Sequence, residues 1–351
     1  MFGMHGGDVY RNEVELDFSV SVNPIGVSQE IKDSFNKINE DCSLYPDPEY
    51  VELREAIARE HGVKANHVVC GNGASEIILG LVHSIKPKKI LIPVPTFSGY
   101  ERATIGSGAA VKFWHLKEEN DFKIESDIIW ELENGYDMVF ICNPGNPTGA
   151  LLNGRLLAKI IELCEEKRTW LVLDNCFMDF IRPDKGLGEL IERYKRLIVI
   201  KAFTKYYGIP GVRLGYALSG DARMLMNLKL HLPEWNVSSI AQRAGVAALN
   251  SKDYYSNTIN LIAIERKFLE QELKRVFSEA GKSVRIFDGQ ANYIMFKTDV
   301  ELYQELLKQK ILIRNCANYR LLGPGYYRIA VKNHEDNHRL IEAIRKVLNE
   351  G

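Results

Sequence analysis

Lys205 is the residue with the clearest potential for chemistry in this chain. It follows the apolar run 197–200 and precedes a Gly-Ile-Pro-Gly turn, an arginine at 213 and a second apolar run, a pattern that predicts strand, loop and strand. A lysine held between two buried strands can lose enough hydration to lower its pKa, as a Schiff-base lysine requires. A lone loop lysine is more commonly solvated, so the role of Lys205 depends on its neighbours.

Two further polar residues follow apolar strand-like runs. Asp174 comes directly after the run WLVL at 170–173, so its carboxylate lies at the end of a buried strand and needs a cationic partner. A protonated pyridine nitrogen would be one. Asn146 belongs to the loop 143–149, where two Asn-Pro pairs and two glycines restrict the backbone, and its amide could bond a phenolic oxygen.

Two more segments could contact a phosphorylated ring. The glycine-rich turn 71–76 precedes an apolar helix, so Gly73, Ala74 and Ser75 would offer close backbone approach and unpaired N–H groups to an anion. Such a turn is structural about as often as functional, and this one lacks the lysine of a P-loop. Phe97, just beyond another strand, could stack on a flat ring, although a lone aromatic more commonly belongs to the core.

Seven apolar segments must position these residues, and most of them are separated by helical periodicity. Such alternation predicts an α/β fold with a mainly parallel sheet covered by helices on both faces. Ligands in these folds bind at the carboxyl ends of the strands, where the loops above lie. The segments are 68–70, 89–93, 110–116, 136–142, 170–174, 197–202 and 213–219.

The periodicity suggests two domains and an arm. Residues 1–45 are irregular with one strand-like stretch at 16–20, and residues 46–235 carry the alternating strands and helices. From 236 to 351 the pattern changes to long helices followed by a smaller α+β section. We expect a large cofactor-binding domain and a small C-terminal domain that packs with part of the arm.

Composition narrows the classes of partner. The 351 residues include 45 lysines and arginines against 46 aspartates and glutamates, so no overall charge favours nucleic acid or a membrane surface. The six cysteines form no C-x-x-C pair, which argues against a zinc site or a disulfide framework. The N-terminus resembles no signal sequence, and no apolar run has the length of a membrane span. These features predict a cytoplasmic protein without a metal site that binds small molecules.

The ordered motifs resemble those of one family. The strings GNGASE, PTF, NPGNPTG, the strand-end Asp174, TK at 204–205 and GVRLGY at 211–216 are similar to the fold type I pyridoxal-phosphate enzymes of the class I/II aminotransferase group, over essentially the whole chain. The strings HGGD, YPD, ILIRNCANY and YYRIAV resemble the branch of threonine-phosphate decarboxylases of cobalamin biosynthesis, relatives of the histidinol-phosphate aminotransferases. The resemblance implies an aspartate aminotransferase-like fold.

The resemblance also assigns roles around pyridoxal 5′-phosphate. Lys205 would form the Schiff base, and Asp174 would keep the pyridine nitrogen protonated, so that the ring acts as an electron sink. Tyr45 of the YPD string would reach the cofactor phosphate of a neighbouring subunit, which implies a homodimer. The remaining roles are phosphate binding by Thr204, Arg213 and the N–H groups around Ala74 and Ser75, ring stacking by Phe97, and bonding of O3′ by Asn146.

A second set of residues would bind the substrate. Arg328 matches the arginine that clamps the α-carboxylate in this family, a role suited to its planar fork. Arg314 and His5 match positions that bind the substrate phosphate in the decarboxylases, although His5 could also be an unstructured terminal residue. Asn23 would lie near the substrate.

Three positions depart from the family pattern. Asn175 stands where the family usually has a glutamate after the strand-end aspartate. Phe177 stands where the aminotransferases have a tyrosine that donates to O3′, and a phenylalanine there fits the decarboxylases. Ala202 replaces a serine or threonine that commonly meets the cofactor phosphate, at a cost of about 1 kcal/mol if nothing replaces that contact.

Three functions follow from this pattern. The first is a decarboxylase of L-threonine O-3-phosphate or L-serine O-phosphate in cobalamin biosynthesis, and the second is an aminotransferase of the histidinol-phosphate type. Both would use the same residues and differ in which Cα bond lies perpendicular to the ring. The third, a non-catalytic cofactor-binding regulator, is disfavoured by the intact Lys205, Asp174 and Arg328 and by the absence of a DNA-binding segment.

Overall fold

The seven apolar segments form one sheet with the strand order β2-β8-β7-β6-β5-β3-β4. Four of its pairings, those that link β4, β3, β5, β6 and β7, are parallel, so the predicted mainly parallel α/β sheet is confirmed. β8 runs antiparallel to both neighbours because a short connection, not a crossover helix, returns the chain from β7. The strands are β2 (Val68–Gly71), β3 (Lys89–Val94), β4 (Ala110–His115), β5 (Met138–Cys142), β6 (Trp170–Asp174), β7 (Leu197–Ala202) and β8 (Gly215–Ser219).

This computed structural model of the chain describes residues 6–181, 186–251 and 254–350. Successive residues of the central strands point to opposite faces of the sheet, and both faces are buried: in β7, Ile198 and Ile200 pack on one side and Leu197 and Val199 on the other. One face is covered by α4 (Ala74–Ile85), α5 (Gly99–Thr104) and α10 (Ala222–Leu230). The other is covered by α3 (Val51–His61), α6 (Ile128–Leu132), α7 (Gly154–Glu166), α8 (Leu187–Arg193) and α11 (Ser239–Leu249).

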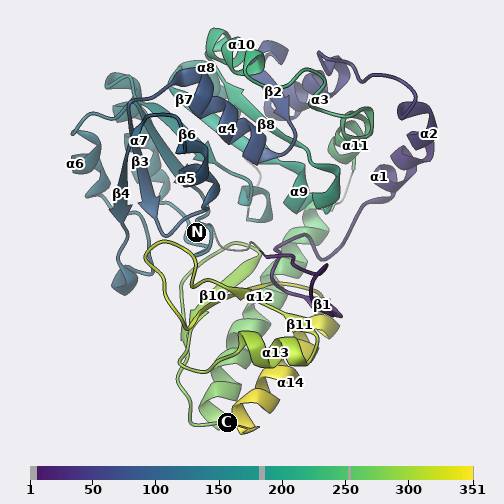
Figure 1. Cartoon of the computed structure of the whole chain (residues 1–351), viewed down its shortest axis with the longest axis vertical. Helices are drawn as coiled ribbons and strands as arrows, with labels where there is room; N and C mark the ends of the chain where they lie inside the picture. Colours follow the sequence, from purple (N-terminus) through teal and green to yellow (C-terminus); the bar gives the residue numbers. More distant parts are fainter. Residues whose placement is uncertain (1–5, 182–185, 252–253, 351) are drawn as a thin grey trace.

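A smaller part of the molecule is built on a four-stranded antiparallel sheet, β12-β13-β10-β9 (Figure 1). The long helix α12 runs from the large sheet down into this part, where it packs beside α14. Its elements are α12 (Tyr254–Glu279), β9 (Arg285–Ile286), β10 (Tyr293–Lys297), α13 (Tyr303–Lys308), β11 (Ile311–Leu312), β12 (Arg314–Asn315), β13 (Tyr326–Ala330) and α14 (His334–Glu350).

The N-terminal arm touches both parts. Its strand β1 (Leu16–Asp17) pairs in parallel with β11, whereas its helices α1 (Gln29–Ser34) and α2 (Ile38–Asp41) lie beside α11. The predicted division at residue 235 stays a prediction, and α11, which follows it, packs against α3 of the large sheet. Within the described residues, no helix combines the length and apolar character needed to cross a bilayer.

Candidate active site

Lys205 lies at the floor of a cavity of about 280 Å³ between the large sheet, the arm and the small antiparallel sheet. It belongs to the single helical turn α9 (Phe203–Tyr206), which begins where β7 ends, so the strand end delivers the amine to the cavity. Burial, followed by the positive charge of Arg328, lowers the pKa of Lys205 to about 8. A substantial fraction of this amine is therefore neutral near physiological pH and able to act as a nucleophile.

Asp174 ends the neighbouring strand β6 and also lines the cavity. Two groups orient its carboxylate: the Tyr100 hydroxyl donates to Oδ2 at 2.6 Å, and the Cys176 N–H donates to Oδ1 at 3.0 Å. Burial, with the nearby Asp174 charge, raises the pKa of Tyr100 well above its usual value, so this hydroxyl keeps its proton. The carboxylate is thus held in one orientation, with its cavity-facing side available to a cation.

Tyr100 is a site residue that the sequence motifs did not reveal. It is fully buried, stacks on Phe140 with ring centroids 4.9 Å apart, and meets Phe97 edge to face. Its position three residues after Phe97, in the first turn of α5, was the only signal in the sequence. Phe97 itself lines the cavity, and Gly99 leaves room for its ring, because a Cβ at that glycine would lie 2.2 Å from Phe97 Cε1.

An anion-binding seat forms where α4 begins. Gly73 is the residue that caps α4, and no side chain satisfies the first N–H groups of the helix, which belong to Ala74 and Ser75 in the cavity wall. Gly73 has a φ of 82°, and an added Cβ would lie 2.4 Å from Arg213 Nη2. The guanidinium of Arg213 therefore packs directly over the glycine and faces the same part of the cavity, which Thr204 also lines.

Asn146 and Arg328 form the opposite wall. The Asn146 Oδ1 atom accepts from Arg328 Nη1 at 2.5 Å and from the Tyr319 hydroxyl at 3.1 Å, which leaves the amide N–H groups of Asn146 to a ligand. Arg328 Nη2 also donates to the Ser19 carbonyl of the arm at 2.9 Å. The buried Nε–H of Arg328 has no partner among the described residues, so this guanidinium retains an unused donor.

Arg314 lies directly opposite Arg328 across the antiparallel pair β12–β13, and both line the cavity. Paired residues of adjacent antiparallel strands project from the same face of the sheet at close range. Arg314 Nη2 donates to Asn318 Oδ1 at 2.6 Å. Three arginines, Arg213, Arg314 and Arg328, and one lysine thus line one cavity, an arrangement that favours a ligand with more than one anionic group.

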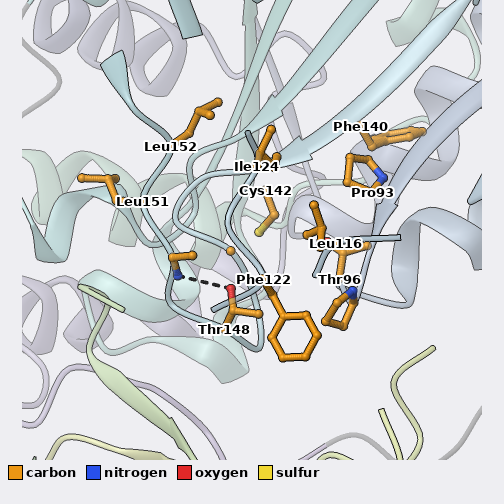
Figure 2. A pocket seen from close by; sticks show the side chains of 13 residues that line it. Pro93, Thr96, Leu116, Phe122, Ile124, Phe140, Cys142, Thr148, Leu151 and Leu152 are labelled. Carbon is orange, nitrogen blue, oxygen red and sulfur yellow. Dashed lines mark hydrogen bonds between the residues drawn. The ribbon is translucent and has the colours of Figure 1, made fainter. Parts of the chain in front are cut away.

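A second cavity lies beneath the Asn146 loop (Figure 2). Its lining includes Leu116, Phe122, Ile124 and Phe140, and Thr148 Oγ1 accepts from the Ala150 N–H at 3.2 Å. No charged side chain is present among the described residues that line it. The apolar side chains that line it pack beneath the loop, and none of them offers a group for acid–base chemistry.

Three predicted site residues within the described parts of the chain, Gly73, Asn23 and Tyr45, are not part of the cavity lining, although Gly73 lies directly under the Arg213 guanidinium. The side-chain amide of Asn23 donates to the Tyr206 carbonyl and to Thr258 Oγ1, each at 2.8 Å, and its backbone N–H donates to the Lys205 carbonyl. Asn23 therefore stabilises the backbone of α9, the helical turn that carries Lys205, and does not face the cavity. Tyr45 is 83% exposed and packs on Trp235, and His5 lies outside the described residues.

Comparison with known proteins places this geometry in a family. The model of the family "Aminotransferase class I and II" matches residues 13–344. The chain belongs to this family. A threonine-phosphate decarboxylase from Salmonella typhimurium is 34% identical over 95% of this chain and 91% of its own length. A histidinol-phosphate aminotransferase structure from Clostridium acetobutylicum superimposes with a TM-score of 0.87 at 31% identity, covering 96% of this chain and all of that chain.

Class I/II aminotransferases and their decarboxylase relatives depend on pyridoxal phosphate, and so does this enzyme. A histidinol-phosphate aminotransferase from Sinorhizobium meliloti, 19% identical with a TM-score of 0.82 over 96% of this chain and 92% of that one, is in complex with pyridoxal 5′-phosphate. The residues present fit this cofactor. They offer a half-buried amine of lowered pKa, a carboxylate at the cavity floor, and a helix start cleared by Gly73 for an anion.

Proposed function

We propose that this enzyme decarboxylates a phosphorylated amino acid, L-threonine O-3-phosphate or L-serine O-phosphate, in cobalamin biosynthesis. The observation that carries the proposal is the pair Arg314 and Arg328, opposed in register and facing the same cavity as Lys205. Such a pair suits a substrate with a carboxylate at one end and a phosphate at the other. The decarboxylase relative supports the proposal.

The cofactor would be held by groups around the strand ends. Lys205 would bind it covalently, Asp174 would pair with its pyridine nitrogen, and Phe97 would cover its ring. Its phosphate would lie at the start of α4, within reach of the N–H groups of Ala74 and Ser75, with Arg213 and Thr204 beside it. Asn146 would donate an amide N–H to O3′.

The substrate would bind on the side facing the small sheet. Arg328 would take the α-carboxylate: its Nε–H has no partner among the described residues, while its Nη1 anchors Asn146. Arg314 would take the phosphate, together with His5 of the arm. Gly6 and Ser19 of the arm line the cavity beside Arg314, which supports this direction of approach.

Decarboxylation breaks the bond between Cα and the carboxylate carbon, releases carbon dioxide, and puts one proton on Cα. The bound cofactor supplies the sink for the electron pair released from Cα. Lys205 is the only amine among the described residues that line the cavity, so it is our candidate for returning the proton to Cα. Phe177 lines the same wall without a donor, so O3′ would depend on Asn146.

The proposed assembly is a homodimer. Tyr45 is exposed and does not line the cavity of its own chain, as expected of a residue that completes the site of a neighbouring copy. Large apolar side chains are exposed around it, and a Lys229–Glu49 ion pair brings the end of α10 to the same segment. They are Leu44 (74% exposed), Trp235 (45%) and Leu230 (77%).

An assay of both reactions tests the proposal. Carbon dioxide release from L-threonine O-3-phosphate and L-serine O-phosphate is measured beside transamination of histidinol phosphate with 2-oxoglutarate. We expect carbon dioxide release with at least one phosphorylated amino acid. Transamination without decarboxylation would favour the second candidate, an aminotransferase, which the histidinol-phosphate aminotransferase relative at 31% identity supports.

A further inference from the structure

Tyr319 links Arg314 and Arg328, the two cavity-lining arginines of the small sheet. Its ring lies 5.0 Å from the Arg314 guanidinium carbon, within the range of a cation–π contact. Its hydroxyl donates to Asn146 Oδ1, the same atom that accepts from Arg328 Nη1. One side chain therefore contacts Arg314 directly and Arg328 through a shared acceptor.

The two arginines need such a link because like charges on opposed strand positions repel each other. The ring of Tyr319 offers Arg314 a negatively polarised face that offsets part of this repulsion. Asn318 Oδ1 also accepts from Arg314 Nη2. The guanidinium is therefore held by both a ring and an amide before any substrate binds.

The backbone around Tyr319 is well fixed. Its N–H donates to the Cys316 carbonyl at 3.0 Å, and the Ala317 N–H donates to Asn315 Oδ1 at 2.9 Å, which closes a turn directly after β12. The side chain is only 8% exposed and packs in an apolar cluster with Phe122 and Tyr326. The turn that follows Arg314 thus supplies the surface on which the same arginine lies.

We propose that Tyr319 is a positioning residue that sets the separation of the phosphate and carboxylate subsites, and thereby gives the enzyme its preference for phosphorylated amino acids. The inference rests on the proposed function, because it takes Arg314 as the phosphate ligand and Arg328 as the carboxylate ligand. The ring and the hydroxyl have separable tasks: the ring holds Arg314, and the hydroxyl holds Asn146.

Two variants separate these tasks. Tyr319→Leu removes ring and hydroxyl, whereas Tyr319→Phe keeps the ring under Arg314. Tyr326→Leu is the matched control for lost packing, because Tyr326 belongs to the same apolar cluster and does not line the cavity. Binding of L-threonine O-3-phosphate and of L-threonine to each holoenzyme is titrated by the change in visible absorbance. The Kd for L-threonine divided by the Kd for L-threonine O-3-phosphate gives the preference for the phosphorylated ligand.

We expect Tyr319→Leu to lower this ratio by roughly tenfold through loss of the cation–π contact and of the guanidinium alignment. Tyr319→Phe should weaken both ligands severalfold with little change in the ratio, and Tyr326→Leu should preserve the ratio. An unchanged ratio in Tyr319→Leu, or an equal fall of the ratio in Tyr326→Leu, would refute the role of Tyr319 and leave the proposed substrate class standing. A ratio near one in the unaltered enzyme would refute the proposed substrate class and this assignment with it.

Discussion

At the scale of single residues, the site combines a lysine that loses its proton readily with a carboxylate held from two sides. Lys205 is desolvated and lies near the charge of Arg328, and Asp174 is oriented by the Tyr100 hydroxyl and the Cys176 N–H. The two groups that orient Asp174 do so through separate hydrogen bonds, so single substitutions should separate their effects.

The lowered pKa of Lys205 gives a pH dependence with a definite sign. Only the neutral amine attacks the cofactor aldehyde, and the neutral fraction rises as the pH rises through the pKa of about 8. The rate at which the cofactor-free protein captures pyridoxal phosphate, followed by visible absorbance, should therefore increase with pH and reach half its maximum near pH 8. A midpoint near the ordinary value of 10.5 would show that the amine is not desolvated.

Removing the Tyr100 hydroxyl should weaken cofactor binding. Tyr100→Phe keeps the stacking on Phe140 but leaves Asp174 Oδ2 without its buried donor, at a cost of about 1 kcal/mol or roughly fivefold in affinity. Equilibrium titration of the cofactor-free protein measures the change. Tyr136→Phe is the control, since that hydroxyl donates to Glu131 outside the cavity. Equal affinities in the two variants would contradict the role given to Tyr100.

At the scale of elements, the ends of β6 and β7 and the start of α4 bring the cofactor groups together. Strand ends fix where Asp174 and Lys205 emerge, because both strands are paired along their length in the centre of the sheet. The start of α4 supplies a partial positive charge without any side-chain cap. The cofactor phosphate is thus expected at a place that the backbone defines.

Gly73→Ala should disrupt this phosphate seat. The new Cβ would strain a residue with φ of 82° and displace the Arg213 guanidinium, so we expect cofactor affinity to fall on the order of tenfold or more. Gly106→Ala is a matched control, because Gly106 has a similar φ of 76° but open space around it. It should cost only about 1 kcal/mol of stability, read from thermal unfolding. If both variants lost cofactor affinity to a comparable extent, the displacement of Arg213 would not be the cause.

Much of the arrangement of strands and helices around the site could be predicted from the sequence. The apolar runs at 170–174 and 197–202 became strands over the same residues, because buried parallel strands carry an uninterrupted apolar pattern. Tyr100 and Tyr319 were missed because their roles come from contacts with residues 74 and 173 positions away, which no local pattern encodes. Asn23 was expected near the substrate, yet its amide bonds to Tyr206 and Thr258 behind Lys205.

At the scale of the whole molecule, three parts of the chain line the cavity. Figure 1 shows these parts, the large sheet, the small sheet and the N-terminal arm, next to one another. The large-sheet side provides Lys205 and Asp174, the small sheet provides Arg314 and Arg328, and the arm provides Gly6 and Ser19. Arg328 ties the small sheet to the arm through the Ser19 carbonyl and to the large sheet through Asn146. A shift of the small part relative to the large part would therefore move Arg314 and Arg328 together.

The proposed dimer predicts that two inactive variants can complement each other. If Tyr45 completes the site of the neighbouring copy, a mixed dimer of Lys205→Ala and Tyr45→Ala subunits contains one site with both residues intact. Mixing the two variants after reversible dissociation should restore up to about half of the activity per mixed dimer. Activity that stays at the average of the two separate variants would show that Tyr45 does not act across the interface.

In the proposed reaction the bond between Cα and the carboxylate breaks while the Cα–H bond survives. This is tested with L-threonine O-3-phosphate labelled with ¹³C in the carboxylate and with deuterium at Cα, followed by nuclear magnetic resonance. We expect the ¹³C label to appear in carbon dioxide and bicarbonate, while deuterium remains on the carbon that bears the amine of the amino-alcohol phosphate. Loss of deuterium to solvent, with the ¹³C label retained in a keto acid, would contradict this expectation.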